Sequence, residues 1–193
     1  MKNSLQQELK QAHQKSAKPM LWVAMISMTM MFAGLTSAYV VSRSRADWVS
    51  FILPNAFNIS TTLIVLSSLT FLMAKKFIKN GNQQMTTLFL VSTLLLGLGF
   101  VYFQLDGFSQ LYKEGLYFAG DQSTVKSSFV YGITVAHLAH VFAGIIVLIV
   151  VLFNHLSKKY SASNYLGLEL GAIFWHFVDI VWIYLFFFFY FIR

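Results

Sequence analysis

Cysteine is absent from the sequence, so disulfide bonds, cysteine-ligated iron–sulfur centres and thiol chemistry are excluded. Proline is almost absent. Its two occurrences, Pro19 and Pro54, lie near the start of apolar runs, where a helix tolerates proline at its entrance. The long apolar stretches that follow are therefore free to form uninterrupted helices.

Charged residues are also scarce. They make up 11% of the 193 residues, and 57% of the chain is hydrophobic, whereas an average soluble domain is about 25% charged. An apolar helix of about 20 residues crosses the ~30 Å hydrocarbon core of a bilayer, because it rises about 1.5 Å per residue. The sequence therefore predicts an all-α integral membrane bundle of five transmembrane helices, with spans at about 20–41, 51–74, 85–105, 127–153 and 170–192.

The first 19 residues form a polar N-terminal tail, and residues 20–193 form a single membrane domain. Leu5, Leu9 and Ala12 repeat at helical spacing in the tail. Both a short helix on the membrane surface and a frayed end fit this pattern. A cleaved signal peptide is not expected, because the next apolar run is longer than the apolar core of such a peptide.

The net charge of +7 does not point to a nucleic acid partner, because the basic residues flank the apolar spans. Nine of the fourteen Lys and Arg residues lie in the tail and in the connections after the second and fourth spans, and the other five lie on the opposite side. The side of a membrane that carries more Lys and Arg is usually the cytoplasmic one. We therefore expect a cytoplasmic N-terminus and a C-terminus outside, which is the periplasm in a bacterium with two membranes.

Methionine is concentrated in the first span, at Met25, Met28, Met30 and Met31. Thioethers are soft ligands that select copper(I), so this run raises the question of copper ligation. No His or Cys lies beside these residues in the sequence, and methionine also fills irregular spaces adaptably. The sequence therefore favours packing over metal binding here.

The last span carries ionisable side chains in its apolar interior, in the run Trp175-His176-Phe177-Val178-Asp179-Ile180-Val181-Trp182. Such residues must find a partner or stay neutral in a membrane, so they mark a specific site. His176 and Asp179 are three residues apart and share a helix face. We expect Trp175 and Trp182 to pack or hydrogen-bond beside them.

The fourth span adds His137 and His140. At 1.5 Å per residue, His137 lies about 15 Å below the outer surface, near the level of Asp179, and His140 lies near the level of His176. A face of small residues on this span is expected to let the last span pack closely against it. Its members are Gly132, Ala136, Ala139 and Ala143.

Three interpretations of this polar cluster stay open. In the first, the His and Asp side chains satisfy one another by hydrogen bonds and stabilise the bundle. In the second, imidazoles at i and i+3 on facing helices ligate iron or zinc, although the chain has no Glu-x-x-His pattern. In the third, the residues influence a proton path, as Asp and His chains do in pumps.

Several segments occur in a fixed order. Residues 96–104 end in Gln104, residues 137–144 read His-Leu-Ala-His-Val-Phe-Ala-Gly, and residues 167–182 run from Gly167 through Glu169 to Trp182. Pro54 and Asn58 mark the entrance of the second span. This order and spacing resembles subunit III of the haem–copper oxidases, in the compact five-helix bacterial form, over about residues 20–191.

The resemblance implies a non-redox subunit of a respiratory terminal oxidase of the cytochrome c oxidase type, in a bacterial cell membrane. Haem and copper would lie in partner subunits and not in this chain. Such a subunit packs directly against subunit I, within a complex that also holds subunit II and small subunits, and can belong to a larger respiratory supercomplex. It binds phospholipid in a cleft between a helix pair and a larger bundle, and it sustains proton uptake and proton pumping.

The resemblance also assigns His137, His140, Glu169, His176 and Asp179 to the polar core of the family. Two positions depart from the family pattern. Met28 stands where the family often has a membrane-embedded Glu. Gly107, preceded by Asp106, stands where the family has an acidic residue after the third-span Gln.

Rival functions remain at this point. Quinol oxidases and some nitric oxide reductases have similar third subunits. A small membrane transporter would need half-helices broken by Gly or Pro near the polar cluster. The fourth and fifth spans contain no such break, so the sequence favours the oxidase subunit.

Overall fold

The structure, a computed structural model, describes residues 2–45, 48–49, 51–120, 123–162 and 164–192, with side chains from residue 15 onward. In this part of the chain the regular elements are five α-helices. They are α1 (Lys2–Ser42), α2 (Asn55–Lys79), α3 (Gln83–Lys113), α4 (Val125–Leu156) and α5 (Leu166–Phe191). Each of the five is long and apolar enough to cross a membrane. The predicted all-α bundle of five membrane helices is confirmed, and the orientation in the membrane stays a prediction.

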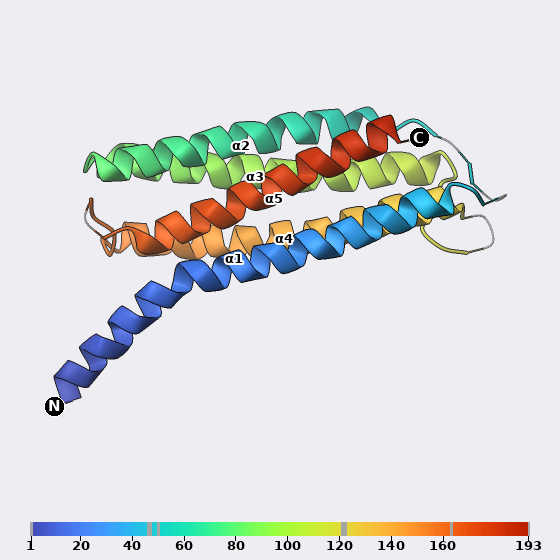
Figure 1. Ribbon diagram of the computed structural model, residues 1–193. Coiled ribbons are helices and arrows are strands. Elements are labelled where there is room, and N and C mark those ends of the chain that lie inside the picture. Colours follow the sequence, from blue (N-terminus) through green and yellow to red (C-terminus); the bar gives the residue numbers. More distant parts are fainter. Residues whose placement is uncertain (1, 46–47, 50, 121–122, 163, 193) are drawn as a thin grey trace.

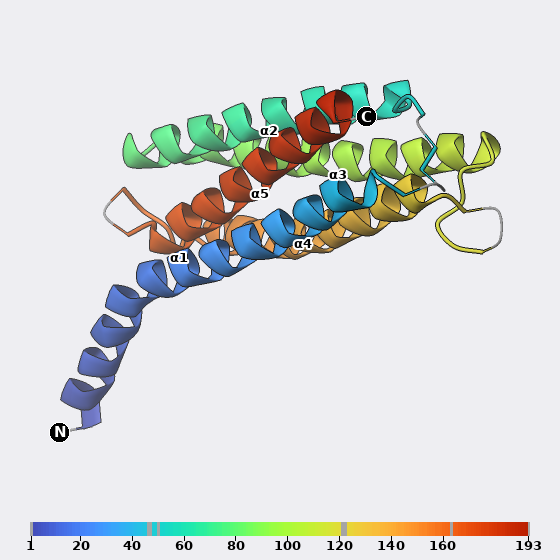
Figure 2. The same ribbon diagram turned by 45° about the vertical axis from the view of Figure 1, so that its right-hand side comes forward.

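The polar N-terminal tail is part of α1, which runs without a break from Lys2 to Ser42. The first part of this helix extends beyond the ends of the other four helices (Figures 1 and 2). Pro19 therefore lies inside the helix and not at its entrance. It lies near the start of the segment Lys15–Ser42 that is apolar enough to span a membrane.

Two helix boundaries differ from those predicted. The second helix begins at Asn55, directly after Pro54, and not near residue 51. The third helix continues past residue 105 to Lys113. Gly107 does not end it, because this glycine packs against the ring of Phe57, and a Cβ atom there would lie 2.9 Å from a ring carbon.

The helices α2 to α5 surround a common core, and α1 lies on the outside of α4 and α5 (Figure 1). Helix α5 contacts α1, α2 and α4. In the most apolar window of α5, 56% of the residues are buried, whereas the figure for α1 is 17%. The helix that carries His176 and Asp179 therefore lies at the centre of the fold.

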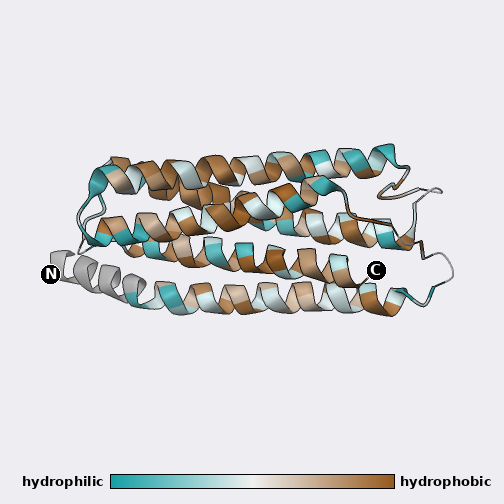
Figure 3. Cartoon of the chain, turned by 90° about the horizontal axis from the view of Figure 1, so that it is seen from above, coloured by the Kyte–Doolittle hydropathy of each residue, from teal (hydrophilic) through white to brown (hydrophobic). Residues whose placement is uncertain are grey.

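Hydropathy follows the long axis of the bundle. Apolar residues cover the helices over most of their length, and hydrophilic residues gather mainly near the two ends (Figure 3). The α2–α3 and α4–α5 connections lie together at one end, which we call the basic end because Lys75, Lys76, Lys79, Lys158 and Lys159 lie in or beside them. Length, composition and this distribution make the chain a multi-pass membrane protein.

Candidate functional site

The two tryptophans of α5 anchor this helix to α2. The Trp175 indole nitrogen donates to the Ser67 hydroxyl at 3.1 Å, and the Trp182 indole nitrogen donates to the Thr61 hydroxyl at 2.9 Å. Both rings are 1% exposed. A buried indole N–H needs an acceptor, so each hydrogen bond avoids the free-energy cost of burying that group without a partner.

Glycines on two other helices make room for Trp175. A Cβ atom at Gly97 of α3 would lie 2.7 Å from the indole, and one at Gly144 of α4 would lie 3.1 Å from it. Gly171 of α5 similarly faces Val151 of α4, where a Cβ atom would lie 3.0 Å from the side chain. The close packing of α3, α4 and α5 therefore depends on these glycines.

Two members of the small-residue face of α4, Gly132 and Ala143, line open spaces between the helices. Gly132 lies in a pocket beside Leu35 of α1, and Ala143 lies in a groove beside Leu21 of α1. Ala139 is exposed. One residue along a helix is a turn of about 100°, so Gly144 meets Trp175 while its neighbour Ala143 faces away. The packing role of Gly132, Ala136 and Ala143 against the last span stays a prediction.

His176 and Asp179 face α2. The Nδ1 atom of His176 lies 2.6 Å from the Ser68 hydroxyl. Asp179 is 2% exposed, and neither of its carboxyl oxygens forms a hydrogen bond with a residue that the structure describes. The Ser68 hydroxyl also faces this carboxyl group, outside hydrogen-bond geometry. The expected His–Asp hydrogen bond is therefore not formed in this part of the chain.

His137 and His140 face a different side of the core. The Nε2 atom of His137 lies 3.1 Å from the Val178 carbonyl oxygen, and Nδ1 of His140 lies 2.7 Å from the Ala136 carbonyl oxygen. The ring of Phe32 from α1 packs against both imidazoles, with centroid distances of 6.2 Å and 5.6 Å. Both histidines therefore meet Phe32 of α1, and His137 also meets the backbone of α5, while His176 and Asp179 face α2.

Glu169 lies apart from the other four residues. It is in the first turn of α5, ten residues before Asp179, which is about 15 Å along the helix. Its carboxylate pairs with Lys18 of α1 at 2.7 Å and with Lys75 of α2 at 3.7 Å. Glu169 thus links three helices at the basic end and does not join the buried polar residues.

The Ser and Thr residues of α2 were expected to bond carbonyl groups of their own helix, and their contacts with α3 and α5 were not predicted. Besides Thr61, Ser67 and Ser68, the hydroxyl of Ser60 accepts a hydrogen bond at 3.0 Å from the buried Gln104 of α3. The four hydroxyls form two pairs, and the members of each pair are seven residues apart: Ser60 with Ser67, and Thr61 with Ser68. A seven-residue repeat stays on one face of a helix, so this spacing was a usable signal.

The described residues contain no group of three or more His, Cys, Asp and Glu side chains that can hold a metal ion. The buried polar groups instead form separate contacts between pairs of helices. Their geometry fits a role in joining the helices, and it does not form a continuous chain of hydrogen bonds along the bundle among these residues.

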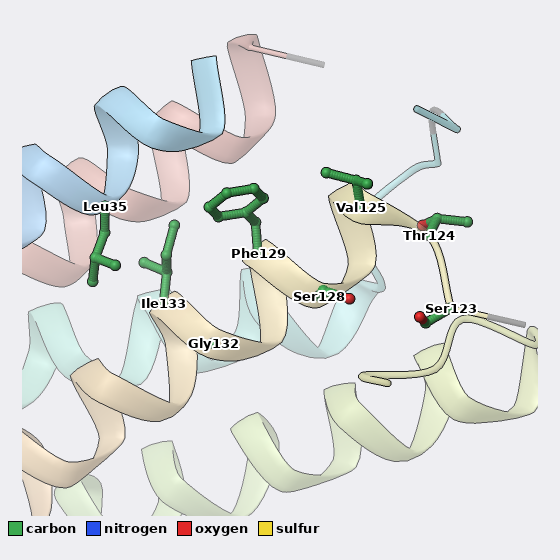
Figure 4. A pocket seen from close by; sticks show the side chains of 8 residues that line it. All are labelled: Leu35, Ser123, Thr124, Val125, Ser128, Phe129, Gly132 and Ile133. Atoms are coloured by element: carbon green, nitrogen blue, oxygen red, sulfur yellow. The ribbon is translucent and has the colours of Figure 1, made fainter. Parts of the chain in front are cut away.

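A pocket and a groove lie beside α1, the outer helix. A pocket of about 340 Å³ lies between α1 and the start of α4, with Leu35, Phe129 and Ile133 on its apolar side and the hydroxyls of Ser128 and Thr124 near the helix start (Figure 4). A groove of about 490 Å³ lies near the basic end between α1, α4 and α5. Apart from the backbone, its lining is apolar.

Comparison with known proteins identifies a family and several relatives that the chain is similar to. Residues 3–193 match the family model described as cytochrome c oxidase subunit III. A cytochrome bo(3) ubiquinol oxidase subunit 3 of Buchnera aphidicola is 30% identical over 88% of this chain and 83% of its own length. A cytochrome c oxidase subunit 3 of Bacillus sp. is 26% identical over 86% of this chain and 80% of its own.

The cytochrome c oxidase subunit 3 of Drosophila yakuba is 33% identical over 66% of this chain, and the match spans 47% of that relative. The chain thus spans about half the length of this Drosophila relative and most of the length of the two bacterial ones. The family model covers nearly all of the sequence, in agreement with the five membrane helices. The chain belongs to the cytochrome c oxidase subunit III family.

Proposed function

We propose that the chain is the third subunit of a bacterial inner-membrane terminal oxidase that takes electrons from cytochrome c and reduces oxygen while protons are pumped. The observation that carries this proposal is the family match over residues 3–193. The Buchnera relative supports a second candidate, in which the same type of subunit serves a quinol oxidase. The fold is compatible with both, because the electron donor binds elsewhere in such a complex.

The test is to isolate the complex through a tag on this chain in a gentle detergent. We expect subunits I and II to elute with it together with haem, and the complex to consume oxygen when supplied with reduced cytochrome c. If quinol supports oxygen consumption and reduced cytochrome c does not, the complex is a quinol oxidase. Elution of a colourless chain without partners would contradict both.

In this proposal the chain is non-redox, with haem and copper held by partner subunits, and it stabilises subunit I and sustains proton uptake. The direct partner is subunit I, and subunit II, small subunits and a larger supercomplex complete the assembly. The contacts of Trp175, His176 and Trp182 with α2 support a stabilising role, because they hold the centre of the bundle together. Met28 and Gly107 provide no carboxylate at two positions where the family often has one.

We also propose that phospholipid binds along α1. The groove near the basic end is lined by Met20, Leu21, Ala143 and other apolar residues, and its volume of about 490 Å³ is ample for part of an acyl chain. Lys18, which pairs with Glu169 and remains 45% exposed, lies next to the lining residue Ala17 and can meet a lipid phosphate. In the described residues all five helices form one bundle, so this groove takes the place of the expected cleft beside a separate helix pair.

Filling this groove is expected to reduce the amount of bound phospholipid. In the variant Ala143→Trp, the new indole occupies the space beside Leu21, so we expect the phospholipid that copurifies per chain to fall at least by about half. The matched control is Ala139→Trp, because Ala139 is exposed on the same helix and does not line the groove. Lipid mass spectrometry of the two purified variants checks the prediction, and equal lipid content would contradict it.

A further inference from the structure

We propose that the ion pair between Lys18 of α1 and Glu169 of α5 is a latch that closes the apolar groove near the basic end, and that this end of α1 moves away from α5 when the pair opens. The Lys18 ammonium lies 2.7 Å from the Glu169 carboxylate. The pair joins the two walls of the groove of about 490 Å³, because neighbours of both residues line it: Ala17, Met20 and Leu21 on α1, and Gly167, Leu170 and Gly171 on α5. The proposal rests on the phospholipid site proposed above and adds how that site opens.

The outer half of α1 is held to α5 by buried contacts. The Thr36 and Tyr184 hydroxyls lie 3.0 Å apart, and the Tyr39 hydroxyl donates to the Ile192 carbonyl oxygen at 3.0 Å. Phe32, Thr36 and Tyr39 are each 3% exposed or less. This half of α1 therefore provides a fixed point about which the rest of the helix can turn.

The half of α1 near the basic end packs more loosely. Between residues 19 and 31, Met25 is the one buried side chain. The hydroxyls of Ser27 and Thr29 bond carbonyl groups of α1 itself and not of another helix. The Lys18–Glu169 pair therefore provides the polar attachment of this half of α1 to α5.

Pro19 makes α1 deformable next to the latch. A proline inside a helix has no N–H group and removes the hydrogen bond to the carbonyl four residues earlier, which bends the helix. Pro19 directly follows Lys18 within α1. The views in Figures 1 and 2 show α1 changing direction where it leaves the bundle. Lys18 can therefore change position while the membrane span stays helical.

Opening of the latch does not leave Glu169 without a partner. Lys75 of α2 lies 3.7 Å from the other carboxylate oxygen and stays with α2 when α1 moves. Lys18 is 45% exposed, and an ion pair of such exposure contributes little to stability, because solvent screens it. The closed and open arrangements are therefore close in free energy, and a ligand that prefers one of them shifts the balance. A lipid phosphate that pairs with Lys18 favours opening.

The test measures the distance between α1 and α2 in the full chain, reconstituted in lipid nanodiscs. The chain has no cysteine, so Val23→Cys and Leu72→Cys accept the only two spin labels, at positions that are 65% and 49% exposed. Pulsed electron paramagnetic resonance gives the distribution of their separations. In Glu169→Gln we expect the population with the longer separation to grow at least about threefold, which is the scale of an exposed ion pair. Lys18→Met is expected to act in the same way, because it removes the other charge and keeps the apolar stem.

The matched control is Glu114→Gln, because Glu114 is an exposed carboxylate that follows α3 at the opposite end of the bundle. A larger long-separation population in Glu169→Gln and Lys18→Met, with the control unchanged, supports the latch. A distribution in either variant that matches the unmodified chain overturns it, and so does an equal change in all three variants. The measurement needs no phospholipid in the groove and no oxidase activity, so the latch, the phospholipid site and the proposed function can fail separately.

Discussion

Replacing Trp175 with alanine is expected to lower the free energy of unfolding by about 3–5 kcal/mol. The indole is 1% exposed and fills the space between the glycines of α3 and α4. Its removal leaves a cavity at the centre of the bundle and deprives the Ser67 hydroxyl of its donor. Titration of the purified chain with sodium dodecyl sulfate, followed by circular dichroism, measures the change.

The matched control is Trp22→Ala. Trp22 is 57% exposed on α1, so its removal leaves no internal cavity. We expect this change to alter the free energy of unfolding by no more than about 0.5 kcal/mol. Trp175→Phe is expected to lie between the two, because it keeps part of the ring and loses the hydrogen bond. Similar midpoints for Trp175→Ala and Trp22→Ala would contradict the central position of Trp175.

The second large effect is expected from Gly97→Ala, which should destabilise the bundle by about 1–3 kcal/mol. The new Cβ atom would lie 2.7 Å from Cη2 and 2.9 Å from Cζ2 of Trp175, so the indole or α3 must move. Gly34→Ala serves as the control, because nothing lies within 4 Å of a Cβ atom at that position. The same detergent titration compares the two variants.

A double-mutant cycle identifies the clash. Phenylalanine at position 175 lacks the outer atoms of the indole that the Cβ atom would meet. The cost of Gly97→Ala should therefore be smaller in a Trp175→Phe background than in the unmodified chain, with a coupling of about 0.5–3 kcal/mol. Additive effects of the two substitutions would show that the clash does not determine the stability.

The buried carboxyl group of Asp179 lacks the histidine partner that the sequence predicted for it. Its carboxyl group lies in the core without a hydrogen bond to a described residue, and the histidine expected beside it binds the Val178 carbonyl. An ionised carboxylate in such a place is strongly disfavoured. The hydroxyl of Ser68 lies 2.6 Å from Nδ1 of His176 and also faces the Asp179 carboxyl group.

The level of His137 along the bundle could be predicted from the sequence, and the neighbours that each helix face meets could not. Counting residues from the ends of the spans correctly placed His137 beside the segment of α5 that contains Asp179, since its ring meets the Val178 carbonyl. The same counting could not tell which side of α5 each residue faces. A rotation of about 100° separates neighbouring residues, so a small error in the orientation of one helix exchanges all its partners.

The sequence by itself determined the class of this protein. The scarcity of charge and the five apolar spans identified a five-helix membrane bundle, because these features are local and follow from length and composition. The three ordered segments added the resemblance to an oxidase subunit. Only the tertiary structure decided that α5 bonds to α2 hydroxyls, that Glu169 pairs with Lys18 at the basic end, and that Gly97 and Gly144 make room for Trp175. These contacts depend on how each helix is rotated against its neighbours, which packing across the whole bundle determines and no single segment encodes.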